Sequence, residues 1–536
     1  MQIRSISLSK SFYHPGEEVT FLFEIDSQQI GTAELLIQVQ HLAESPQLLR
    51  FHVQLKAGSH PLEINWQPPS KPAGYAVKAG LLAADGSFLS EANLCFDVLN
   101  DWTDYPRYGY LTDFSPLRSD LRATIAELAR YHVNGLQFYD WQYRHDQLLA
   151  PTRDYIDPLG RAMSLDTVER LVQAAADYGM AAMPYLAVYA ASAAYWRAHL
   201  ESALYDQQGQ PIPFGEDFLG LMNPAEGTTW HEHLLKECDR ALQAIPFSGL
   251  HIDQYGEPRQ VWDAHANPVD LPGAFADFIR AARANHRNQT ILFNAVSNWP
   301  IETLAACPLN FLYIEIWPPD VHYTDVALIV LEAVRLSGGR PVVIALYLPA
   351  SQPENVLLVD ALITACAGTR IELGETVRLL ADPYFPKHQE ISPELKANLL
   401  KHYDFMARFG EWLQAYTLSA GEREIWAQGE LQPVYVQTDA QVWSIARRRP
   451  DGLQLNLVNL NGLDQNLSWD AAHEAPLPVE NLVVRVRLAK KPARIYWACA
   501  EMAEQPPLEL NFDFEDGEVT FNIPSLQLSG VIFIHE

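Results

Sequence analysis

The chain has 536 residues, of which 48% are hydrophobic, and its formal net charge is −28 because 66 Asp and Glu outnumber 38 Lys and Arg. A chain of this length exceeds one hydrophobic core, so we expect several domains. The negative charge argues against a nucleic-acid or anionic-membrane partner and fits a protein that acts on a neutral ligand.

Residues 1–102 alternate apolar and polar side chains with the period of two that is typical of β-strands. Short strands separated by turn residues predict an immunoglobulin-like β-sandwich. The segment Met1–Lys10 lacks the apolar core of a signal peptide, so we expect a cytoplasmic protein, or a secreted one if a leader has been removed. The clearest strand-like runs are 19–25, 33–39, 49–55 and 74–82.

Residues 103–418 alternate strand-like runs with amphipathic helices, which is typical of parallel β/α units. Eight such units predict a central (β/α)8 TIM barrel. The expected helices cover 121–131, 165–178, 274–286, 325–336 and 356–366. The expected strands start near Tyr108, Gly135, Ala181, Gly249, Thr290, Phe311, Pro341 and Arg370.

One stretch of the barrel region, residues 178–196, is uncharged and long enough to raise the possibility of a membrane span. Pro184 and four tyrosines interrupt it, so we expect a strand followed by a loop of small residues, and no membrane partner.

Residues 419–536 return to the alternating pattern and predict a C-terminal antiparallel β-sandwich. The whole chain is therefore expected to be a multidomain α/β protein, with the barrel flanked by two β-sandwiches. The C-terminal strand-like runs are 433–437, 441–446, 453–458, 483–488, 519–523 and 532–535.

Two lone carboxylates close apolar runs in the barrel region. Asp253 ends the apolar run in Gly249-Leu-His-Ile-Asp-Gln-Tyr-Gly256, and Glu315 ends the one in Phe311-Leu-Tyr-Ile-Glu-Ile-Trp317. Barrel enzymes place their chemistry at the carboxyl ends of the strands. Cleavage of a glycosidic bond needs at least two acids there, one that acts as nucleophile or base and one that donates a proton.

Other carboxylates, amides and aromatic residues follow the same strand ends and suit a neutral, polyhydroxylated ligand. Acids and amides can pair with its hydroxyl groups, and aromatic faces can pack on its C–H faces. For each single residue, a supporting or merely solvated position is an equally good interpretation. The candidate substrate-binding residues are Tyr110, Asp113, Asp140, Trp141, Tyr143, His145, Tyr185, Gln254, Asn294, Trp317, Tyr347 and Glu375.

Metal chemistry is the competing hypothesis, and the sequence gives it little support. His231-Glu-His233 lies in a helix-like stretch, where positions i and i+2 face apart. The five cysteines are scattered without a Cys-x-x-Cys pair. Phosphate-binding glycine loops and Gly-x-Ser-x-Gly nucleophile motifs are also absent from the sequence. We therefore expect neither a metal nor an organic cofactor.

Six motifs follow one another along the barrel region: Tyr108-Gly-Tyr-Leu-Thr-Asp-Phe114, Phe138-Tyr-Asp-Trp-Gln-Tyr-Arg-His145, His251-Ile-Asp-Gln-Tyr-Gly256, Phe293-Asn-Ala-Val-Ser-Asn-Trp299, Tyr313-Ile-Glu-Ile-Trp317 and Ile371-Glu-Leu-Gly-Glu375, the last with Tyr384-Phe-Pro386. Together and in this order they resemble glycoside hydrolase family 66, which holds dextranases and cycloisomaltooligosaccharide glucanotransferases. The resemblance implies action on α-1,6-glucan with retention, with Asp253 as nucleophile and Glu315 as acid/base. It also places Asp113, Trp141, Tyr143, His145, Asn294 and Glu375 within motifs that line the cleft.

The chain departs from the family pattern in two ways. It shows no signal peptide, and it has no inserted carbohydrate-binding module of the kind that some of the transferases carry. We therefore expect internal hydrolysis of dextran or isomaltooligosaccharides, or action on short oligosaccharides, in preference to cyclisation. A transglycosylase that makes (cyclo)isomaltooligosaccharides and a non-catalytic glucan-binding protein remain the alternatives, and the sequence does not predict an oligomeric state.

Overall fold

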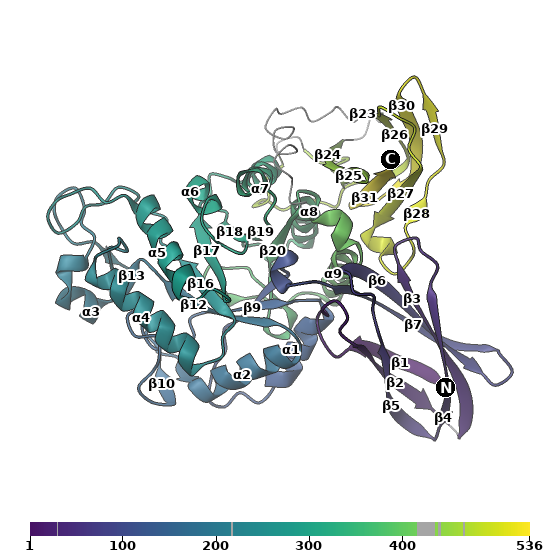
Figure 1. Ribbon diagram of the computed structural model, residues 1–536, viewed down its shortest axis with the longest axis horizontal. Helices are drawn as coiled ribbons and strands as arrows, with labels where there is room; N and C mark the ends of the chain where they lie inside the picture. The colour runs from purple at the N-terminus through teal and green to yellow at the C-terminus, as the bar shows by residue number, and fades with distance from the viewer. Residues whose placement is uncertain (29, 216–217, 415–434, 438–440, 465–466) are drawn as a thin grey trace.

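The computed structural model describes residues 1–28, 30–215, 218–414, 435–437, 441–464 and 467–536. Three parts follow one another along the chain: an N-terminal pair of sheets, a central parallel sheet with helices, and a C-terminal pair of sheets (Figure 1). The predicted boundary between residues 418 and 419 lies outside the described residues.

The N-terminal part consists of two antiparallel sheets, with orders β1-β2-β5 and β4-β3-β6-β7, that share one hydrophobic core. The four predicted strands are confirmed as β2, β3, β4 and β6, whereas β1, β5 and β7 are additional. The immunoglobulin-like class stays a prediction. The bounds are β1 (Gln2–Leu8), β2 (Val19–Ser27), β3 (Gly31–His41), β4 (Gln47–Leu55), β5 (Gly58–Trp66), β6 (Ala73–Ala83) and β7 (Phe88–Val98).

The central sheet has eight parallel strands in the order β20-β19-β18-β17-β16-β12-β9-β8, and each predicted strand is present. The two ends of this order lie close together, where Thr369 Oγ1 donates to the carbonyl of Pro106 at 2.6 Å. The sheet is therefore a nearly closed barrel, consistent with the predicted TIM barrel. The strands are β8 (Tyr108–Leu111), β9 (Gly135–Phe138), β12 (Ala181–Ala187), β16 (Gly249–Asp253), β17 (Thr290–Val296), β18 (Leu312–Glu315), β19 (Val342–Ala345) and β20 (Gly368–Ile371).

Helices follow most of these strands, and the five predicted from the sequence are confirmed to within a few residues. α2 shows why: its buried Leu165, Val168, Leu171 and Val172 recur at helical spacing on one face. The pattern did not predict α9, which lies after the last barrel strand. The helices are α1 (Leu121–Arg130), α2 (Leu165–Asp177), α3 (Ala193–Ala198), α4 (Thr229–Ala244), α5 (Leu271–Asn285), α6 (Ile301–Ala305), α7 (Tyr323–Ser337), α8 (Pro353–Ala365) and α9 (Pro393–Leu413).

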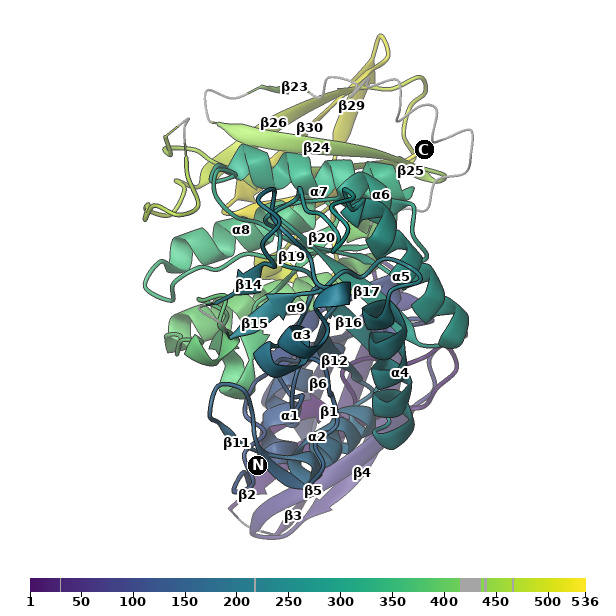
Figure 2. The same cartoon turned by 90° about the vertical axis from the view of Figure 1, so that its left-hand side faces the viewer.

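Short extra elements stand between the barrel strands and their helices, and Figure 2 shows α3, β14 and β15 in front of the barrel. The uncharged stretch 178–196 forms β12, β13 and the start of α3. In the described part of the chain, no helix is long and apolar enough to cross a membrane. The extra elements are β10 (Asp154–Ile156), β11 (Ala162–Ser164), β13 (Ala190–Ser192), β14 (Pro213–Phe214), β15 (Leu219–Leu221), β21 (Leu373–Gly374), β22 (Arg378–Leu379), η1 (Trp102–Asp104), η2 (Leu200–Ser202), η3 (Glu375–Val377) and η4 (Phe385–Lys387).

The C-terminal part is a second pair of antiparallel sheets, with orders β23-β26-β30-β29 and β24-β25-β31-β27-β28, around its own core. Of the predicted run 433–437, residues 433 and 434 lie outside the described residues and the rest is β23. The other five predicted runs are confirmed. The elements are β23 (Tyr435–Gln437), β24 (Val442–Arg449), β25 (Gly452–Asn459), β26 (Val479–Arg487), β27 (Arg494–Cys499), η5 (Ala500–Met502), β28 (Leu508–Glu509), β29 (Phe512–Glu515), β30 (Glu518–Leu526) and β31 (Ser529–His535).

A buried ion pair joins the N-terminal sheets to the barrel. Arg107, just before β8, donates to both carboxylate oxygens of Asp97 in β7 at 2.7 and 3.0 Å. Its Nε also donates to the carbonyl of His132 at 2.6 Å. Both charged side chains are almost completely buried, so each needs the other as its counterion.

We expect Arg107→Met to lower the free energy of unfolding by about 3–5 kcal/mol, because it leaves the Asp97 carboxylate buried without a counterion. The double variant Arg107→Met/Asp97→Leu should recover most of this loss, since no charge is then stranded. Urea unfolding of both variants measures the effect. A single variant as stable as the unchanged protein would contradict the assigned role.

Candidate active site

The two carboxylates predicted from the sequence lie at the same end of the barrel. Asp253 is the last residue of β16 and Glu315 the last residue of β18, with β17 between them. Asn294 of β17 donates from its single side-chain nitrogen to Asp253 Oδ1 at 2.8 Å and to Glu315 Oε2 at 2.9 Å. These two oxygens are therefore no more than about 6 Å apart.

A tyrosine hydroxyl holds the outer oxygen of each acid. Tyr185 of β12 donates to Asp253 Oδ2 at 2.9 Å, and Tyr347, just after β19, donates to Glu315 Oε1. Because the strand order here is β12-β16-β17-β18-β19, the side chains follow one another along the rim as Tyr185, Asp253, Asn294, Glu315 and Tyr347. All four carboxylate oxygens have a donor.

Burial raises the pKa of both acids. For Asp253, the nearby charge of Glu315 adds to this effect and raises the pKa to about 7, against the opposing hydrogen bonds from Asn294 and Tyr185. For Glu315, the neighbouring donors of Tyr347, Asn294 and Trp317 oppose the rise that burial causes. Two adjacent buried acids disfavour double ionisation, so the pair retains a proton to higher pH than two exposed acids.

A cavity of about 210 Å³ lies at the Asp253 end of the rim and includes Tyr185 in its wall. Gln142 and His145, which are 2% and 7% exposed, each have a side-chain atom there without a hydrogen-bond partner. An aromatic pocket with a few unpaired polar atoms suits a ligand with both C–H and hydroxyl faces. The lining residues are Tyr139, Asp140, Gln142, His145, Asp157, Pro158, Leu159, Tyr185, Tyr189, Phe214, Phe218, Leu219 and Tyr384.

Two of the predicted site residues that line this cavity, Asp140 and His145, have shifted pKa values. Burial raises the pKa of Asp140 to about 6, although Arg161 opposes the rise. Burial lowers the pKa of His145 to about 4, so its ring is neutral near pH 7. Asp140 also adopts a left-handed backbone conformation with φ of 50°, which is uncommon for a residue with a side chain.

The structure places Trp141 and Tyr110 beneath the site. Trp141 is fully buried and donates from Nε1 to the carbonyl of Tyr185 at 3.2 Å. Tyr110 is also fully buried, with its ring 5.0 Å from that of Phe385. Trp141 therefore supports Tyr185 from below and does not offer the exposed ring face that we expected for sugar stacking.

Two other predicted residues, Gln254 and Glu375, hold loops that surround the rim. Gln254 accepts from the backbone of Gly256 at 2.7 Å and donates to the carbonyl of Trp299 at 3.1 Å, which joins two loops. Glu375 accepts from the backbone N–H of Asp113 at 2.9 Å and so fixes the loop after β8.

The Asp113 carboxylate is exposed and accepts from Ser115 N at 2.9 Å. Tyr143 is partly buried, and the Arg144 guanidinium lies 4.1 Å from the centre of its ring. Neither Asp113 nor Tyr143 has a described hydrogen bond to the carboxylate pair.

A family model described as glycosyl hydrolase family 66 matches residues 8–533, nearly the whole chain. The chain belongs to glycosyl hydrolase family 66. The bridged carboxylate pair therefore lies in a member of a family of glycoside-active enzymes.

Individual relatives agree with this family. A cycloisomaltooligosaccharide glucanotransferase from Niallia circulans is 28% identical over 379 residues, which cover 65% of this chain and 38% of that protein. The chain thus matches well under half of that relative's length. A dextranase from Streptococcus salivarius is 23% identical over 86% of this chain and 67% of its own.

A solved structure shares the fold across the whole chain. It is the crystal structure of a Paenibacillus sp. cycloisomaltooligosaccharide glucanotransferase complexed with cycloisomaltoheptaose. It covers 99% of both chains with a TM-score of 0.86 and 21% sequence identity.

Two charged residues of this family 66 site were not among the predicted ones. Tyr189, which also lines the cavity, lies two residues beyond β12. Asp157 and Arg161 come from the β10–β11 hairpin, where Arg161 donates to Asp157 at 2.7 Å and to the carbonyl of Asp140 at 3.1 Å. This hairpin has no periodic pattern, so the sequence gives no signal for it.

The two histidines of the His231-Glu-His233 motif join α4 to neighbouring loops. His231 Nδ1 pairs with the carbonyl of Pro224 at 2.8 Å, and His233 Nε2 pairs with that of Asp146 at 2.6 Å, so the two rings have separate partners. Within the described residues, no group of three or more His, Cys, Asp or Glu is arranged to hold a metal ion.

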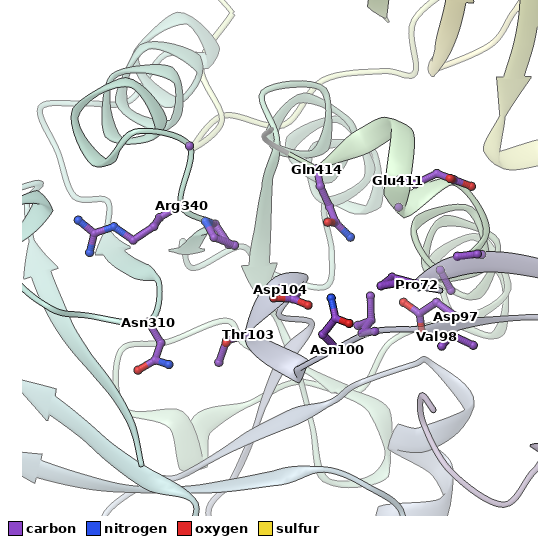
Figure 3. Close-up of a pocket in the computed structure, with 17 residues that line it drawn as sticks. Pro72, Asp97, Val98, Asn100, Thr103, Asp104, Asn310, Arg340, Glu411 and Gln414 are labelled. Carbon is purple, nitrogen blue, oxygen red and sulfur yellow. The ribbon is translucent and has the colours of Figure 1, made fainter. Parts of the chain in front are cut away.

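A larger cavity of about 410 Å³ lies between the N-terminal sheets, α9 and the segments that lead into β18 and β19 (Figure 3). Asn310 and Pro341, which line it, precede those two strands. Because Asp253 and Glu315 stand at the carboxyl ends of their strands, this cavity is at the other end of the barrel and is separate from their site.

We expect Asp253→Asn to raise the Tm at pH 8 by at least about 3 °C, and by much less at pH 4.5. Asp253 has an ordinary pKa near 4 when unfolded and a pKa of about 7 when folded, so ionising it costs stability as the pH rises through that interval. Thermal unfolding at both pH values measures the difference. If the variant changed the Tm equally at the two pH values, or lowered it at pH 8, ionisation of Asp253 would not be what destabilises the folded protein.

Proposed function

We propose that the chain is a retaining glycoside hydrolase that cleaves internal α-1,6-glucosidic linkages in dextran or isomaltooligosaccharides. The observation that carries the proposal is the pair of acids bridged by Asn294. Retaining enzymes hold their two carboxyl groups about 5–5.5 Å apart, against about 6.5–9.5 Å in inverting ones. A single amide that reaches both acids supports the shorter spacing. The names of the dextranase and glucanotransferase relatives support the α-1,6 linkage.

In the first step, the Asp253 carboxylate attacks the anomeric carbon while Glu315 donates its proton to the departing oxygen. The two acids repel each other when both are ionised, so the pair retains one proton, and the reactive form is the one that carries this proton on Glu315 and leaves Asp253 ionised. In the second step, the Glu315 carboxylate takes a proton from water, the water oxygen bonds to the anomeric carbon, and the bond to Asp253 breaks. Two inversions give net retention.

The order of the side chains along the rim supports a proposal for which side of the site binds each part of the substrate. The nucleophile binds the sugar that stays on the enzyme, and the cavity with Gln142 and His145 lies at the Asp253 end. The acid/base acts on the departing or incoming oxygen, and Trp317 and Tyr347 pack together at the Glu315 end with ring centres 5.6 Å apart. We therefore place the donor sugar near Tyr185 and the acceptor near Trp317.

A second candidate function is transfer of the glycosyl group to a sugar hydroxyl in place of water. It uses the same two acids and differs only in the acceptor. The half-buried ring of Trp317 beside Glu315 favours it, because an aromatic surface can hold an acceptor sugar. Retention of both acids argues against the third alternative, a non-catalytic glucan-binding protein.

We expect Asp253→Asn and Glu315→Gln each to lower kcat on dextran by about a thousand-fold or more without loss of folded protein. Added azide should partly restore turnover of Glu315→Gln on an activated aryl substrate and yield a glycosyl azide of retained configuration, because azide needs no general base. Glu302→Gln, the same change on the exposed surface of α6, is the matched control and should keep full activity. Dextran hydrolysis at the unchanged rate in both site variants would refute the proposal.

A further inference from the structure

The segment 316–322 follows Glu315 directly and forms the acceptor side of the proposed site. It begins with Ile316, whose N–H donates to the carbonyl of Ala345 at 3.0 Å. It then carries Trp317, which packs on Tyr347, the tyrosine that donates to Glu315. The position of this segment therefore determines the surface that meets an incoming acceptor.

A loop of the C-terminal part, residues 467–473 between β25 and β26, holds this segment. Trp469 donates from Nε1 to the carbonyl of Asp320 at 2.8 Å and from its backbone N–H to the carbonyl of Val321 at 2.9 Å. Ser468 Oγ lies 3.0 Å from the same carbonyl of Val321 and also contacts the Asp470 carboxylate, so its single proton is shared between these two acceptors. These contacts join residues about 150 positions apart in the chain.

The barrel in turn holds the loop. Trp469 is 7% exposed and belongs to the hydrophobic core of the barrel, not to that of the C-terminal sheets. The fully buried Asn355 of α8 donates to the carbonyls of Trp469 at 3.0 Å and Ala471 at 2.7 Å. Tyr323 and His473 share a further hydrogen bond of 2.7 Å. The loop is thus part of the wall of the barrel next to the acid/base.

We propose that Trp469 is a positioning residue that sets how the glycosyl-enzyme divides between water and a sugar acceptor. The inference rests on the proposed function, because it concerns the second step of the same reaction. Trp469 touches neither acid. It acts through the segment 316–322, whose Asp320 it holds by a hydrogen bond and whose Trp317 faces the acceptor.

In the transfer step, the acceptor hydroxyl gives its proton to the Glu315 carboxylate, its oxygen bonds to the anomeric carbon, and the bond from that carbon to Asp253 breaks. A sugar must be oriented for this attack, whereas water reaches the same carbon without an ordered surface. Loosening the segment 316–322 therefore slows transfer more than hydrolysis. Formation of the glycosyl-enzyme from a substrate with a good leaving group is unaffected, because it needs no acceptor.

Trp469→Phe tests this, because it keeps an aromatic ring in the core and removes the Nε1–H donor to Asp320. Trp497→Phe is the matched control: Trp497 is a buried tryptophan of the same C-terminal part, but it lies in the core of the C-terminal sheets. Ser468→Ala is a milder variant that removes one hydrogen bond to Val321. The measurements are the ratio of transfer to hydrolysis products from isomaltotriose, the rate on an activated aryl α-isomaltoside, and hydrogen–deuterium exchange of residues 316–322.

We expect Trp469→Phe to lower the transfer-to-hydrolysis ratio roughly five-fold, the size expected for one lost hydrogen bond, and to speed exchange of residues 316–322. Ser468→Ala should change the product ratio and the exchange rate in the same direction, and Trp497→Phe should leave both unchanged. In all three variants the rate on the aryl substrate should stay within two-fold. An unchanged ratio in Trp469→Phe and Ser468→Ala, or no transfer products from the unchanged protein, would overturn the inference. Absence of any activity on either substrate would instead refute the proposed function.

Discussion

One side-chain amide holds together two acids that repel each other. Asn294 donates to both Asp253 and Glu315, and this shared donor is available only because β17 lies between the two strands that end in the acids. The parallel strands then fix the spacing of the two acids. Burial raises the pKa of both acids, and the charge of Glu315 raises that of Asp253 further, so the same arrangement that keeps a proton on the pair also costs stability.

The rest of the fold supports this rim from three directions. Trp141 lies beneath Tyr185, and the Arg161 hairpin borders the cavity at the Asp253 end. At the Glu315 end, the support comes from the C-terminal part through Trp469. Both flanking parts therefore contribute to the barrel. The N-terminal sheets contribute a buried counterion for Arg107, and the C-terminal part contributes a loop that holds the segment after Glu315.

The eight barrel strands and the two acids were predictable because a lone carboxylate that closes a buried apolar run is a strong local signal. The burial of individual side chains was not predictable. Tyr110 and Trp141 lie near strand ends as expected, yet tertiary packing buries them completely. Gln142 and the β10–β11 hairpin lack periodicity, and α9 was missed although it packs on β6 and β7. The contact between Trp469 and Asp320 joins distant parts of the chain, so no local pattern indicates it.

The stereochemistry of the first product tests the central claim, that the Asn294-bridged pair performs a double displacement, most directly. Proton NMR during hydrolysis of an isomaltooligosaccharide, recorded before mutarotation, reports the configuration of the newly formed reducing end. Initial formation of the α-anomer is the result that the account predicts. Initial formation of the β-anomer would mean single displacement and would contradict it.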